Sequence, residues 1–417
     1  MTRYGRSPWV DRFPKSRIPS HPRHRGDIET AAVIVGGGLT GCATAYAFAA
    51  AGIKVALLEA DQIGRGSTGS AAGLIADEPG VPFIDIEKAM GSRAARRAWQ
   101  AWRRASLDFA ALLRRLGVKC DLDPRPAITV ALTPEQLLRL KRDQKTRRAA
   151  GLDAPLLNAR AVGAEVGLAR LAPGAQGGGI RSKDAATLDP YRACLGLASA
   201  AAKRGAALFE RSPVKKITFG RKAVVVYTAG GALRASQVIV ATGMPTPLFH
   251  SLARHFWFRR SYLALTERVP ARIRQHLGTR AAIVRDSDAP PHAIRWVDDE
   301  QLLVMGADRE APPGRQRDAL IVQRTGQLMY ELSTFYPDIS GVLPEYGWDA
   351  AYARTSDGLP YIGPHRNFPR HLFAFGDSSH SVTGAYLASR ILLRQYLGER
   401  DPADEAFAFT RHGRRGD

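Results

Sequence analysis

One stretch, Ala31–Glu59, constrains the fold more than any other part of the chain. An apolar run meets Gly36, Gly38 and Gly41 in G-x-G-x-x-G spacing, and a helix of small residues follows before a second apolar run. Gly36 permits a tight turn, Gly38 lets a pyrophosphate approach the backbone, and Gly41 lets the helix pack closely on the strand. Glu59 ends the second run and can accept hydrogen bonds from ribose hydroxyls. The pattern predicts a βαβ unit that binds a dinucleotide.

A membrane span is the main alternative for this segment, because Ala31–Ile53 contains no charged residue. About 20 apolar residues are enough to cross a bilayer, and a buried βαβ unit gives the same hydropathy profile. Four glycines in the first half of the segment, and Lys54 directly after it, favour the dinucleotide site.

The composition indicates two domains that share an interface, because the chain has 417 residues, of which 45% are hydrophobic. Cys42, Cys120 and Cys194 are far apart in the sequence and form neither a disulfide framework nor a zinc spacing. No segment resembles a signal peptide. We therefore expect a protein of a reducing compartment, the cytoplasm, without a metal site. Motifs of serine hydrolases, zinc proteases, P-loop enzymes and EF-hands are absent from the sequence.

The formal net charge is +21. A charge of this size suits nucleic acid, an anionic membrane surface or an acidic substrate as a partner. Basic residues cluster at 93–104, 139–148 and 411–415. The segment Ser92–Leu116 places tryptophans and leucines on one helical face and arginines on the other. It therefore either lies on a membrane surface or, as we favour, caps a domain.

The rest of the chain contains segments typical of a parallel α/β sheet and segments typical of an antiparallel sheet. A helix over Leu188–Gly205 precedes a strand over Ala235–Ala241, and a strand over Leu372–Phe375 precedes a helix that ends near residue 397. With the N-terminal unit, these pieces predict one parallel sheet made from three parts of the chain. Alternating apolar and polar residues between 257 and 306 predict a separate antiparallel sheet.

Six stretches, in this order, then carry a resemblance: VIVGGGLTG, LLEADQIGRGSTGSAAGLI, TLDPYR, VIVATG, YGWDAAYARTSDGLPYIG and LFAFGDSSHSVTGAYLAS. Between Val33 and about Gly398 the chain resembles the D-amino-acid-oxidase-like (DAO) family of FAD-dependent oxidoreductases. Within that family, the six stretches are most similar to those of the γ-glutamylputrescine oxidase and glycine oxidase branch. The resemblance implies an α/β fold in which a discontinuous Rossmann-like FAD-binding domain is interleaved with an α+β substrate domain built on an antiparallel sheet.

The implied domain boundaries follow from that architecture. Residues 28–84, 185–243 and 346–400 form the FAD-binding domain, and residues 85–184 and 244–345 form the substrate domain. A basic arm, 1–27, and a basic tail, 401–417, flank them. The first 26 residues are rich in Arg, Pro, Ser and His. They are either a transit peptide or, as we favour, a solvated arm.

The resemblance also implies which residues hold the cofactor. Gly36, Gly38 and Gly41 would hold the pyrophosphate and Glu59 the ribose. Ser67, Thr68, Ala71, Ala72, Gly73 and Leu74 would lie along the flavin end, Val214 and Gly243 beside the adenosine, and Gly376, Asp377 and Thr383 by the flavin pyrimidine ring. A helix N-terminus at that ring would stabilise the negative charge of a reduced flavin. Relatives with a covalent flavin use a cysteine or a histidine. Those positions are Ala350 and Gly69 here, so we expect non-covalent FAD.

Amino-acid-oxidising members of the family place an arginine three residues before the threonine of the T-S-D-G segment, where it binds the substrate carboxylate. Tyr352 occupies that position here. Arg354 follows on the same face of a strand, so it either serves instead or forms a structural ion pair. His380 is the best candidate base, because histidine titrates near neutral pH, and is otherwise a hydrogen-bonding loop residue.

Tyr262 and Arg295 are candidate substrate-binding residues on predicted strands, with the protein core as the alternative place for Tyr262. The implied reaction oxidises a C–N bond of an amine or amino acid by hydride transfer to flavin N5, after which the imine is hydrolysed. Oxygen or another acceptor then removes the electrons. Two alternatives stay open. One is a flavoenzyme that modifies an aminomethyl-uridine of tRNA, and the other is a membrane-docked dehydrogenase that reduces quinone.

Overall fold

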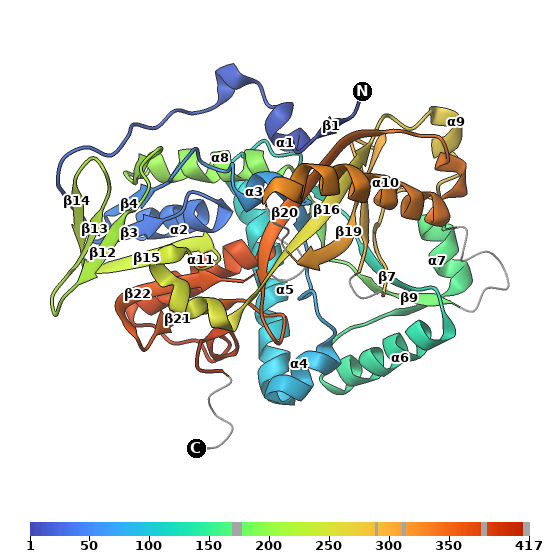
Figure 1. Ribbon diagram of the computed structural model, residues 1–417. Helices are drawn as coiled ribbons and strands as arrows, with labels where there is room; N and C mark the ends of the chain where they lie inside the picture. Colours follow the sequence, from blue (N-terminus) through green and yellow to red (C-terminus); the bar gives the residue numbers. More distant parts are fainter. Residues whose placement is uncertain (169–176, 288–290, 311–313, 377–381, 412–417) are drawn as a thin grey trace.

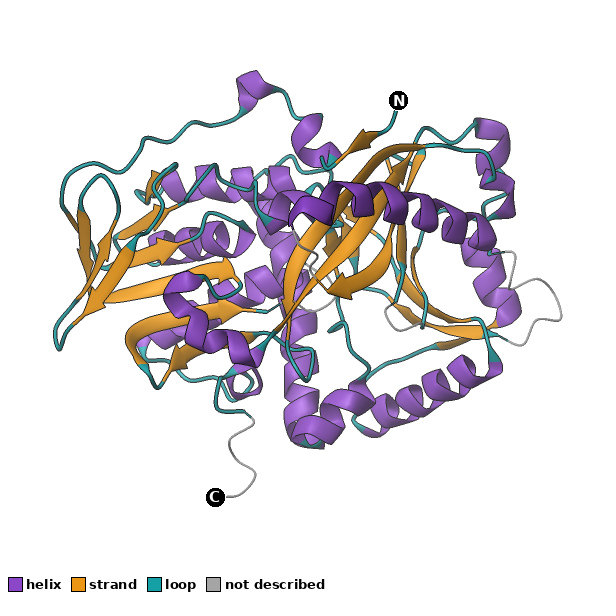
Figure 2. Cartoon of the chain, in the orientation of Figure 1, coloured by secondary structure: helices purple, strands orange, loops and turns teal. Residues whose placement is uncertain are grey.

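A six-stranded sheet is the centre of one half of the molecule. The computed structural model describes residues 1–168, 177–287, 291–310, 314–376 and 382–411 (Figures 1 and 2). The strand order is β11-β4-β3-β15-β22-β21, and every pair is parallel except β21 with β22. The strands are β3 (Ala32–Val35), β4 (Val55–Leu58), β11 (Ala207–Phe209), β15 (Gln237–Gly243), β21 (Tyr361–His365) and β22 (Phe368–Phe375).

Both faces of this sheet are covered, which explains why its first strands read as continuous apolar runs. Ala32 and Ile34 pack on the helix side, whereas Val33 and Val35 pack against a small meander. The helices are α2 (Leu39–Ala50), α8 (Pro190–Ala202) and α11 (Thr383–Leu397), with α2 between the other two. The meander has the order β12-β13-β14-β2, made of β12 (Lys216–Phe219), β13 (Val224–Tyr227), β14 (Ala232–Ala235) and β2 (Ile28–Glu29).

A nine-stranded sheet organises the other half (Figure 1). Its order is β1-β20-β16-β19-β18-β17-β7-β9-β8, with parallel pairs only at β1/β20 and β17/β7. The strands are β1 (Arg3–Tyr4), β7 (Ala127–Ala131), β8 (Leu156–Asn158), β9 (Gly178–Ser182), β16 (Trp257–Thr266), β17 (Ile283–Arg285), β18 (Ala293–Val297), β19 (Gln301–Glu310) and β20 (Pro344–Arg354). Helix α10 (Arg317–Phe335) covers one face, and the opposite face packs toward the first half.

The remaining elements connect the two halves. A three-stranded sheet, β5-β10-β6, is built from β5 (Leu74–Ile75), β10 (Ala186–Thr187) and β6 (Asp123–Pro124). The further helices are α1 (Pro8–Asp11), α3 (Ser67–Ser70), α4 (Phe83–Met90), α5 (Ser92–Arg115), α6 (Pro134–Ala149), α7 (Ala159–Val166) and α9 (Ala271–Arg274). Short 3₁₀ turns include η3 (Pro247–His255) and η6 (Asp404–Phe407).

The α/β fold class and the assembly of one parallel sheet from three parts of the chain are confirmed. One predicted boundary differs. The FAD-binding domain was expected to resume at residue 346, but β20 continues to Arg354 inside the nine-stranded sheet, paired along its length with β16. The register of that long pair, rather than the turn-rich sequence after it, decides to which sheet the segment belongs.

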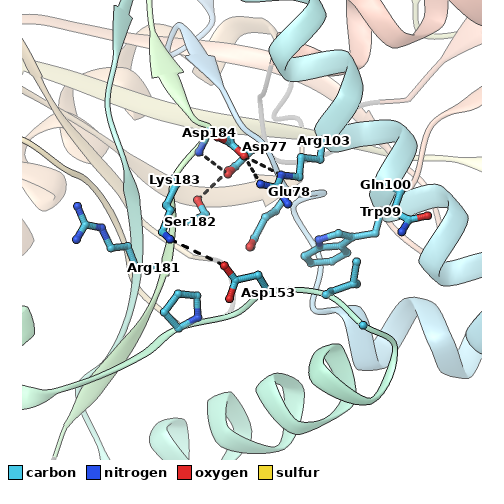
Figure 3. Close-up of a pocket in the computed structure, with 13 residues that line it drawn as sticks. Asp77, Glu78, Trp99, Gln100, Arg103, Asp153, Arg181, Ser182, Lys183 and Asp184 are labelled. Atoms are coloured by element: carbon cyan, nitrogen blue, oxygen red, sulfur yellow. Dashed lines mark hydrogen bonds and ion pairs between the residues drawn. The ribbon is translucent and has the colours of Figure 1, made fainter.

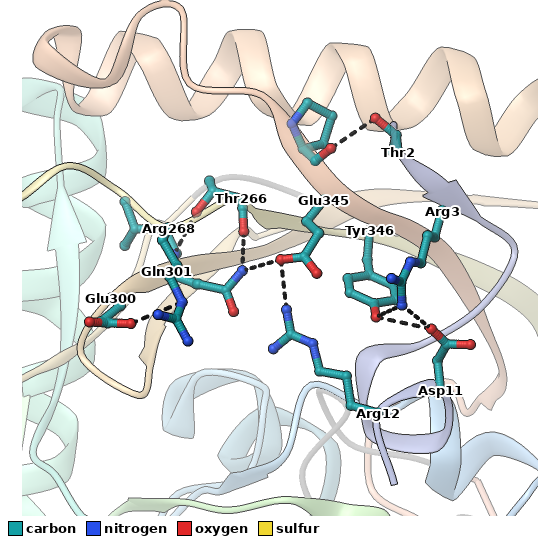
Figure 4. A network of polar contacts seen from close by, with 12 residues as sticks. Thr2, Arg3, Asp11, Arg12, Thr266, Arg268, Glu300, Gln301, Glu345 and Tyr346 are labelled. Atoms are coloured by element: carbon teal, nitrogen blue, oxygen red, sulfur yellow. Dashed lines mark hydrogen bonds and ion pairs between the residues drawn. The ribbon is translucent and has the colours of Figure 1, made fainter. Parts of the chain in front are cut away.

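The N-terminal arm is anchored to the body of the protein and is not a solvated extension (Figure 4). β1 pairs with β20 at Tyr346 and Gly347, and Asp11 accepts hydrogen bonds from Arg3 at 2.6 Å and from the Tyr346 hydroxyl at 3.0 Å. Buried Trp9 donates through Nε1 to the carbonyl of Ala71 at 2.9 Å. The arm therefore links the outer edge of the nine-stranded sheet to the segment that follows β4.

The described part of the C-terminal tail is also docked. Phe407 is fully buried, and Arg411 pairs with Asp357 at 2.6 Å, with both side chains only 2% exposed. The Arg411 guanidinium also donates to the carbonyls of Leu359 and Pro360. The tail thus fixes the turn between β20 and β21.

Long-range folding brings two of the three cysteines together. Sγ of Cys42 on α2 and Sγ of Cys194 on α8 lie 3.6 Å apart as free thiols, and both lie near the carbonyl oxygen of Gly37. Their separation in the sequence gave no sign of this. Among the described residues, no helix is both long and apolar enough to span a bilayer.

Helix α5 caps the interface between the halves, as favoured from its pattern. Trp99 and Trp102 are buried, and Trp102 donates through Nε1 to the carbonyl of Ala76. Its apolar face is therefore occupied by protein, so this face does not lie on a membrane.

Candidate functional site: a dinucleotide cradle that opens into an apolar cleft

The glycine turn between β3 and α2 is as tight as its spacing predicts. Gly36 has φ +108°, and a Cβ there would lie 2.8 Å from the carbonyl oxygen of Ala241. A Cβ at Gly41 would lie 1.8 Å from the carbonyl oxygen of Gly36. Gly38 is the N-cap of α2 and leaves the first turn of the helix without a side-chain cap of its own. Such a helix end presents N–H groups and a favourable dipole to an anion.

Two side chains brace this turn from outside the helix. The Thr68 hydroxyl accepts a hydrogen bond from Leu39 N at 2.9 Å. The Glu59 carboxylate accepts from Gly37 N at 2.6 Å and from Asp61 N at 2.8 Å. Glu59 is only partly buried, and a carboxylate has about four acceptor positions, so it retains capacity for a ligand hydroxyl.

The segment that contains Val214 lies at the same end of the sheet. Ser212 N donates to the Glu59 carbonyl at 2.8 Å, and Arg211 N donates to the Asp61 carbonyl at 2.8 Å. Gly243, which ends β15, accepts a hydrogen bond through its carbonyl from Gly376 N at 2.9 Å. The fold therefore brings these residues together around the carboxyl ends of β3, β4, β15 and β22. Gly36 and Gly376, for example, are 340 positions apart in the chain.

A cleft begins at the first turn of α2 and enters the space between the two halves. It encloses about 780 Å³, counted to its open mouth. Its described lining consists of small, apolar or hydroxyl side chains and includes no Lys, Arg, Asp or Glu: Leu39, Thr40, Ser67, Thr68, Ala71, Gly243, Met244, Ala351, Tyr352, Ala353, Pro360, Ile362, Ala374, Phe375, Gly376, Val382, Gly384, Ala385 and Ala388. Backbone and methyl groups thus form most of the wall, which suits a large planar ring.

Several predicted cofactor residues support this wall without lining it. Ala72, Leu74 and Thr383 are fully buried. The Leu74 carbonyl accepts from Val382 N at 2.9 Å, and the Thr383 hydroxyl donates to the Ala76 carbonyl at 2.7 Å. These contacts fix the start of α11 against β5. Asp377 and the candidate base His380 lie outside the described residues.

Tyr352 lines the cleft, and Arg354 lies near it at the exposed end of β20. Trp348, four residues before Tyr352 on the same face of the strand, donates through Nε1 to the Ser70 carbonyl at 2.9 Å. That face of β20 is therefore turned toward α3. Tyr352 and Arg354 both belong to β20, which is one continuous strand. This agrees with the prediction that the two residues share one face of a strand.

The structure does not bring Tyr262 to the cleft. Tyr262 is 1% exposed and is the register partner of Asp349, so both side chains lie on the face that α10 covers. Asp349 is held there by Arg260 at 2.5 Å and by Arg317 at 2.7 Å. The alternative interpretation of Tyr262, a core residue, fits its place among the buried residues of that face.

Arg295 is also away from the cleft lining. It donates to the Leu188 carbonyl at 3.1 Å, and its guanidinium carbon lies 5.0 Å from the centroid of the Trp9 ring. Burial lowers the pKa of Arg295 to about 10. A Cβ at Gly73, where φ is +70°, would lie 2.2 Å from the same carbonyl. Arg295 and Gly73 thus belong to the packing that joins β18, the arm and the start of α8.

A second cleft, of about 640 Å³, lies between α5, the end of α6 and β9 (Figure 3). Its charged residues largely pair with one another. Arg103 contacts Asp184 at 2.5 Å, and the Ser182 hydroxyl donates to Asp77 at 2.8 Å. The glycine that lines it, Gly151, follows the C-terminus of α6, and the described lining residues include no helix N-terminus that follows a glycine turn, so this cleft lacks the features of a dinucleotide site.

His292, which directly precedes β18, lies between two carboxylates. Its Nδ1 is 2.6 Å from Asp286, and its Nε2 is 3.0 Å from Glu331 on α10. Burial lowers the pKa of His292, but the hydrogen bond and charge of Asp286, with the charge of Glu331, outweigh burial and raise the pKa to about 9. The cation is a structural link between β17 and α10.

This link predicts a pH dependence of stability. Because the folded-state pKa of about 9 exceeds the usual value of about 6.5, protonated His292 contributes fully below pH 6.5, and this contribution is lost as the pH rises through 9. We expect up to about 3 kcal/mol of unfolding free energy to disappear across this window. The difference between wild type and His292→Gln in urea unfolding should shrink from pH 6 to pH 9.5. A constant difference would contradict the assignment.

Comparison with known proteins decides the family. Residues 31–395 match the model of a family described as DAO, FAD dependent oxidoreductase. The chain belongs to the DAO family. The Escherichia coli K12 protein gamma-glutamylputrescine oxidoreductase is 27% identical over 382 residues, which are 91% of this chain and 86% of that protein. Glycine oxidase of Bacillus licheniformis is 25% identical, covering 86% of this chain and 92% of that protein.

Solved DAO-like structures have the same fold. Glycine oxidase from Geobacillus kaustophilus superposes with a TM-score of 0.71 at 21% identity, over 92% of this chain and 99% of that one. L-Amino acid deaminase from Proteus myxofaciens, solved with anthranilate, gives 0.75 at 16% identity, over 99% of both chains. The predicted resemblance is confirmed, and FAD is the cofactor of this DAO member.

The features of the site that sequence patterns missed are its supports. Trp9 and Trp348 hold the carbonyls of Ala71 and Ser70 through their indole N–H groups, and Arg411 holds the turn that precedes Pro360. Trp9 and Arg411 lie outside the six stretches that carry the resemblance, and Trp348 lies within the fifth, which assigned no role to it. Among the described residues, no group of three or more His, Cys, Asp or Glu side chains is arranged to hold a metal ion.

Proposed function

We propose that this DAO-family protein oxidises the C–N bond of a small amine or amino acid. The observation that carries the proposal is the continuity of the glycine cradle with a cleft whose described lining, which includes Ala71, Tyr352 and Gly376, holds no charged side chain. Relatives named for oxidation of γ-glutamylputrescine and glycine support an amine as substrate.

In this proposal the cofactor lies along the edge of the parallel sheet. The glycine turn and the first turn of α2 hold the pyrophosphate, Glu59 binds the ribose, and the backbone near Val214 and Gly243 lies beside the adenosine. The cleft receives the flavin, with Ser67, Thr68 and Ala71 on one side and the start of α11 on the other. Bound FAD supplies an acceptor for a hydride from the carbon that bears the amine, and water then hydrolyses the resulting imine to a carbonyl compound and ammonia.

The chain's own part is to orient the substrate and exclude water. The described lining of the cleft holds no charged side chain. Such a lining favours the neutral form of an amine, which is the form able to release a hydride, because burial disfavours an unpaired ammonium group. In this proposal Tyr352, which lines the cleft, contacts the substrate, and Arg354, exposed two residues further along β20, binds a substrate carboxylate. The described cleft residues include no cysteine or histidine, which supports non-covalent FAD.

A polynucleotide substrate is the less favoured candidate. A protein that binds tRNA needs cations along the path to its active centre, whereas the described cleft lining holds none.

The proposal is tested by adding amines and D- and L-amino acids to the holoenzyme without oxygen. At least one class is expected to bleach the flavin absorption and to release a stoichiometric amount of carbonyl product. If no amine or amino acid bleaches a flavin that dithionite readily reduces, the proposed chemistry is wrong.

Arg354→Ala tests the carboxylate contact. Loss of one charge-assisted hydrogen-bonded pair with the bound substrate is worth about 1.5–3 kcal/mol, so kcat/KM for amino acids should fall about 10- to 150-fold. Amines of the same length without a carboxylate should change less than about threefold. An equal loss for both substrate classes would refute this role for Arg354.

A further inference from the structure

Positive charge is concentrated on two helices of this chain. Together, α5 and α6 hold thirteen Lys or Arg residues and three Asp or Glu residues, a net charge of +10 within 40 residues. The whole chain of 417 residues carries +21. Nearly half of the excess charge therefore lies on less than a tenth of the sequence, so the charge is a local feature rather than an even bias of composition.

Seven cations of these two helices have exposed side chains without a carboxylate partner among the described residues. We define the basic surface as Arg93 and Arg96 of α5 with Arg139, Lys141, Arg142, Lys145 and Arg148 of α6, all of them exposed. Within the described ranges, none of these seven side chains forms a salt bridge or a hydrogen bond with another residue. Arginines elsewhere, such as Arg125, Arg260 and Arg394, are paired with carboxylates.

Direct contacts make the two helices one surface. The Arg147 guanidinium of α6 lies 4.4 Å from the centroid of the Trp99 ring of α5. Arg96 approaches Gly151, just beyond α6, with Nη2 3.6 Å from where its Cβ would be. Arg147 itself is neutralised by Glu78 and Asp143, at 2.7 Å each. The facing sides of α5 and α6 are thus held together by these contacts, whereas the exposed sides of the two helices carry the seven cations of the basic surface. In Figure 1, α4 and α6 form the lower edge of the molecule.

We propose that the basic surface docks the enzyme on an anionic lipid bilayer. Clusters of Lys and Arg on one helical face bind acidic headgroups by long-range attraction and need no insertion. Leu138 is 51% exposed beside these cations, and an apolar side chain in this position is compatible with the headgroup boundary.

Nucleic acid fits this surface less well. Proteins that bind single strands stack bases on exposed aromatic rings. The large exposed apolar side chains on α5 and α6 are Leu107 and Leu138, and no aromatic residue of these helices is among them. Docking on a lipid bilayer, by contrast, would keep the enzyme close to an electron acceptor that is dissolved in that bilayer.

The test is co-sedimentation of the full-length holoenzyme with vesicles of phosphatidylcholine, with and without phosphatidylglycerol. Wild type should bind only the anionic vesicles and should be released in about 1 M salt, where the Debye length is about 3 Å. Each cation near the surface contributes about fivefold to the partition coefficient. The variant R139Q/R142Q/K145Q/R148Q should therefore lose at least about a hundredfold.

A matched variant removes the same charge elsewhere. Lys215, Lys216, Arg221 and Lys222 are exposed on or beside the β12–β13 hairpin, and K215Q/K216Q/R221Q/K222Q should bind anionic vesicles within about fivefold of wild type. Equal losses for the two variants would show a general charge effect and overturn the proposal. It would also be overturned if wild type ignored anionic vesicles, or bound duplex DNA but not vesicles at the same salt concentration. Because the readout is binding, these results are independent of which amine the enzyme oxidises.

Discussion

Gly41→Ala should abolish FAD binding, with an affinity at least about a hundredfold below that of wild type. The added Cβ would lie 1.8 Å from the carbonyl oxygen of Gly36 and 3.0 Å from its carbonyl carbon. Both neighbours are backbone atoms, so α2 must move away from β3, and its N-terminal N–H groups would leave the pyrophosphate position. Titration of the apoprotein with FAD, followed by flavin fluorescence, measures the loss.

Two further variants separate cofactor binding from folding. At Gly38 a Cβ would have only the Thr68 hydroxyl within reach, at 3.2 Å. Gly38→Ala should therefore fold with little loss of stability and still bind FAD poorly, because its methyl group occupies the path of the pyrophosphate. Gly326 lies exposed in the middle of α10 with nothing within 4 Å of its Cβ position. Gly326→Ala should stabilise the protein by about 0.5–1 kcal/mol and leave FAD binding unchanged. Normal FAD affinity in both Gly41→Ala and Gly38→Ala would contradict the cradle.

Arg411→Ala should lower the free energy of unfolding by about 3–5 kcal/mol, because it leaves the buried Asp357 carboxylate without its cation. Arg411 donates to both oxygens of Asp357, at 2.6 and 2.7 Å, and its guanidinium carbon lies 3.6 Å from the centroid of the Tyr361 ring. The turn that it holds reaches the cleft, since a Cβ at Gly376 would lie 3.3 Å from Pro360 Cα. FAD affinity should therefore fall as well. Urea unfolding and FAD titration give the two values.

Removing both charges should do less harm than removing one. The double variant Arg411→Met with Asp357→Leu leaves no unpaired buried charge, so it should recover most of the stability lost by Arg411→Ala. Arg366 is exposed and has no ion pair among the described residues, so Arg366→Ala should stay within about 0.5 kcal/mol of wild type. If Arg411→Ala behaves like Arg366→Ala, the tail does not hold the turn.

Local patterns were enough to predict the cradle, because its constraints act between near neighbours. The close approach of Gly41 to the Gly36 carbonyl is a contact over five residues, and the glycine spacing encodes it directly. The helix predicted over Leu188–Gly205 also begins at a local contact, because the Asp189 carboxylate accepts a hydrogen bond from Arg192 N.

The parts that sequence reasoning missed depend on register and on pairs far apart in the chain. Tyr262 lies on an alternating strand, but a period of two does not say which face meets the cleft. The pairing of Tyr262 with Asp349 decides that, across 87 positions of the chain. The arm and the tail have polar, basic sequences typical of solvated ends. Their anchoring rests on contacts with residues far away in the chain, such as Trp9 to the Ala71 carbonyl and Arg411 to Asp357, which composition does not reveal.

The central claim is that the turn at Gly36–Gly41 and the cleft beyond it hold one dissociable FAD. The most direct measurement is the visible spectrum of the purified protein before and after acid precipitation. We predict a yellow protein whose flavin stays in the supernatant after precipitation, in a one-to-one ratio to chain, and whose apoprotein regains the spectrum when FAD is added. A colourless protein that stays colourless with added FAD would contradict the account, and a flavin that precipitates with the chain would contradict its non-covalent attachment.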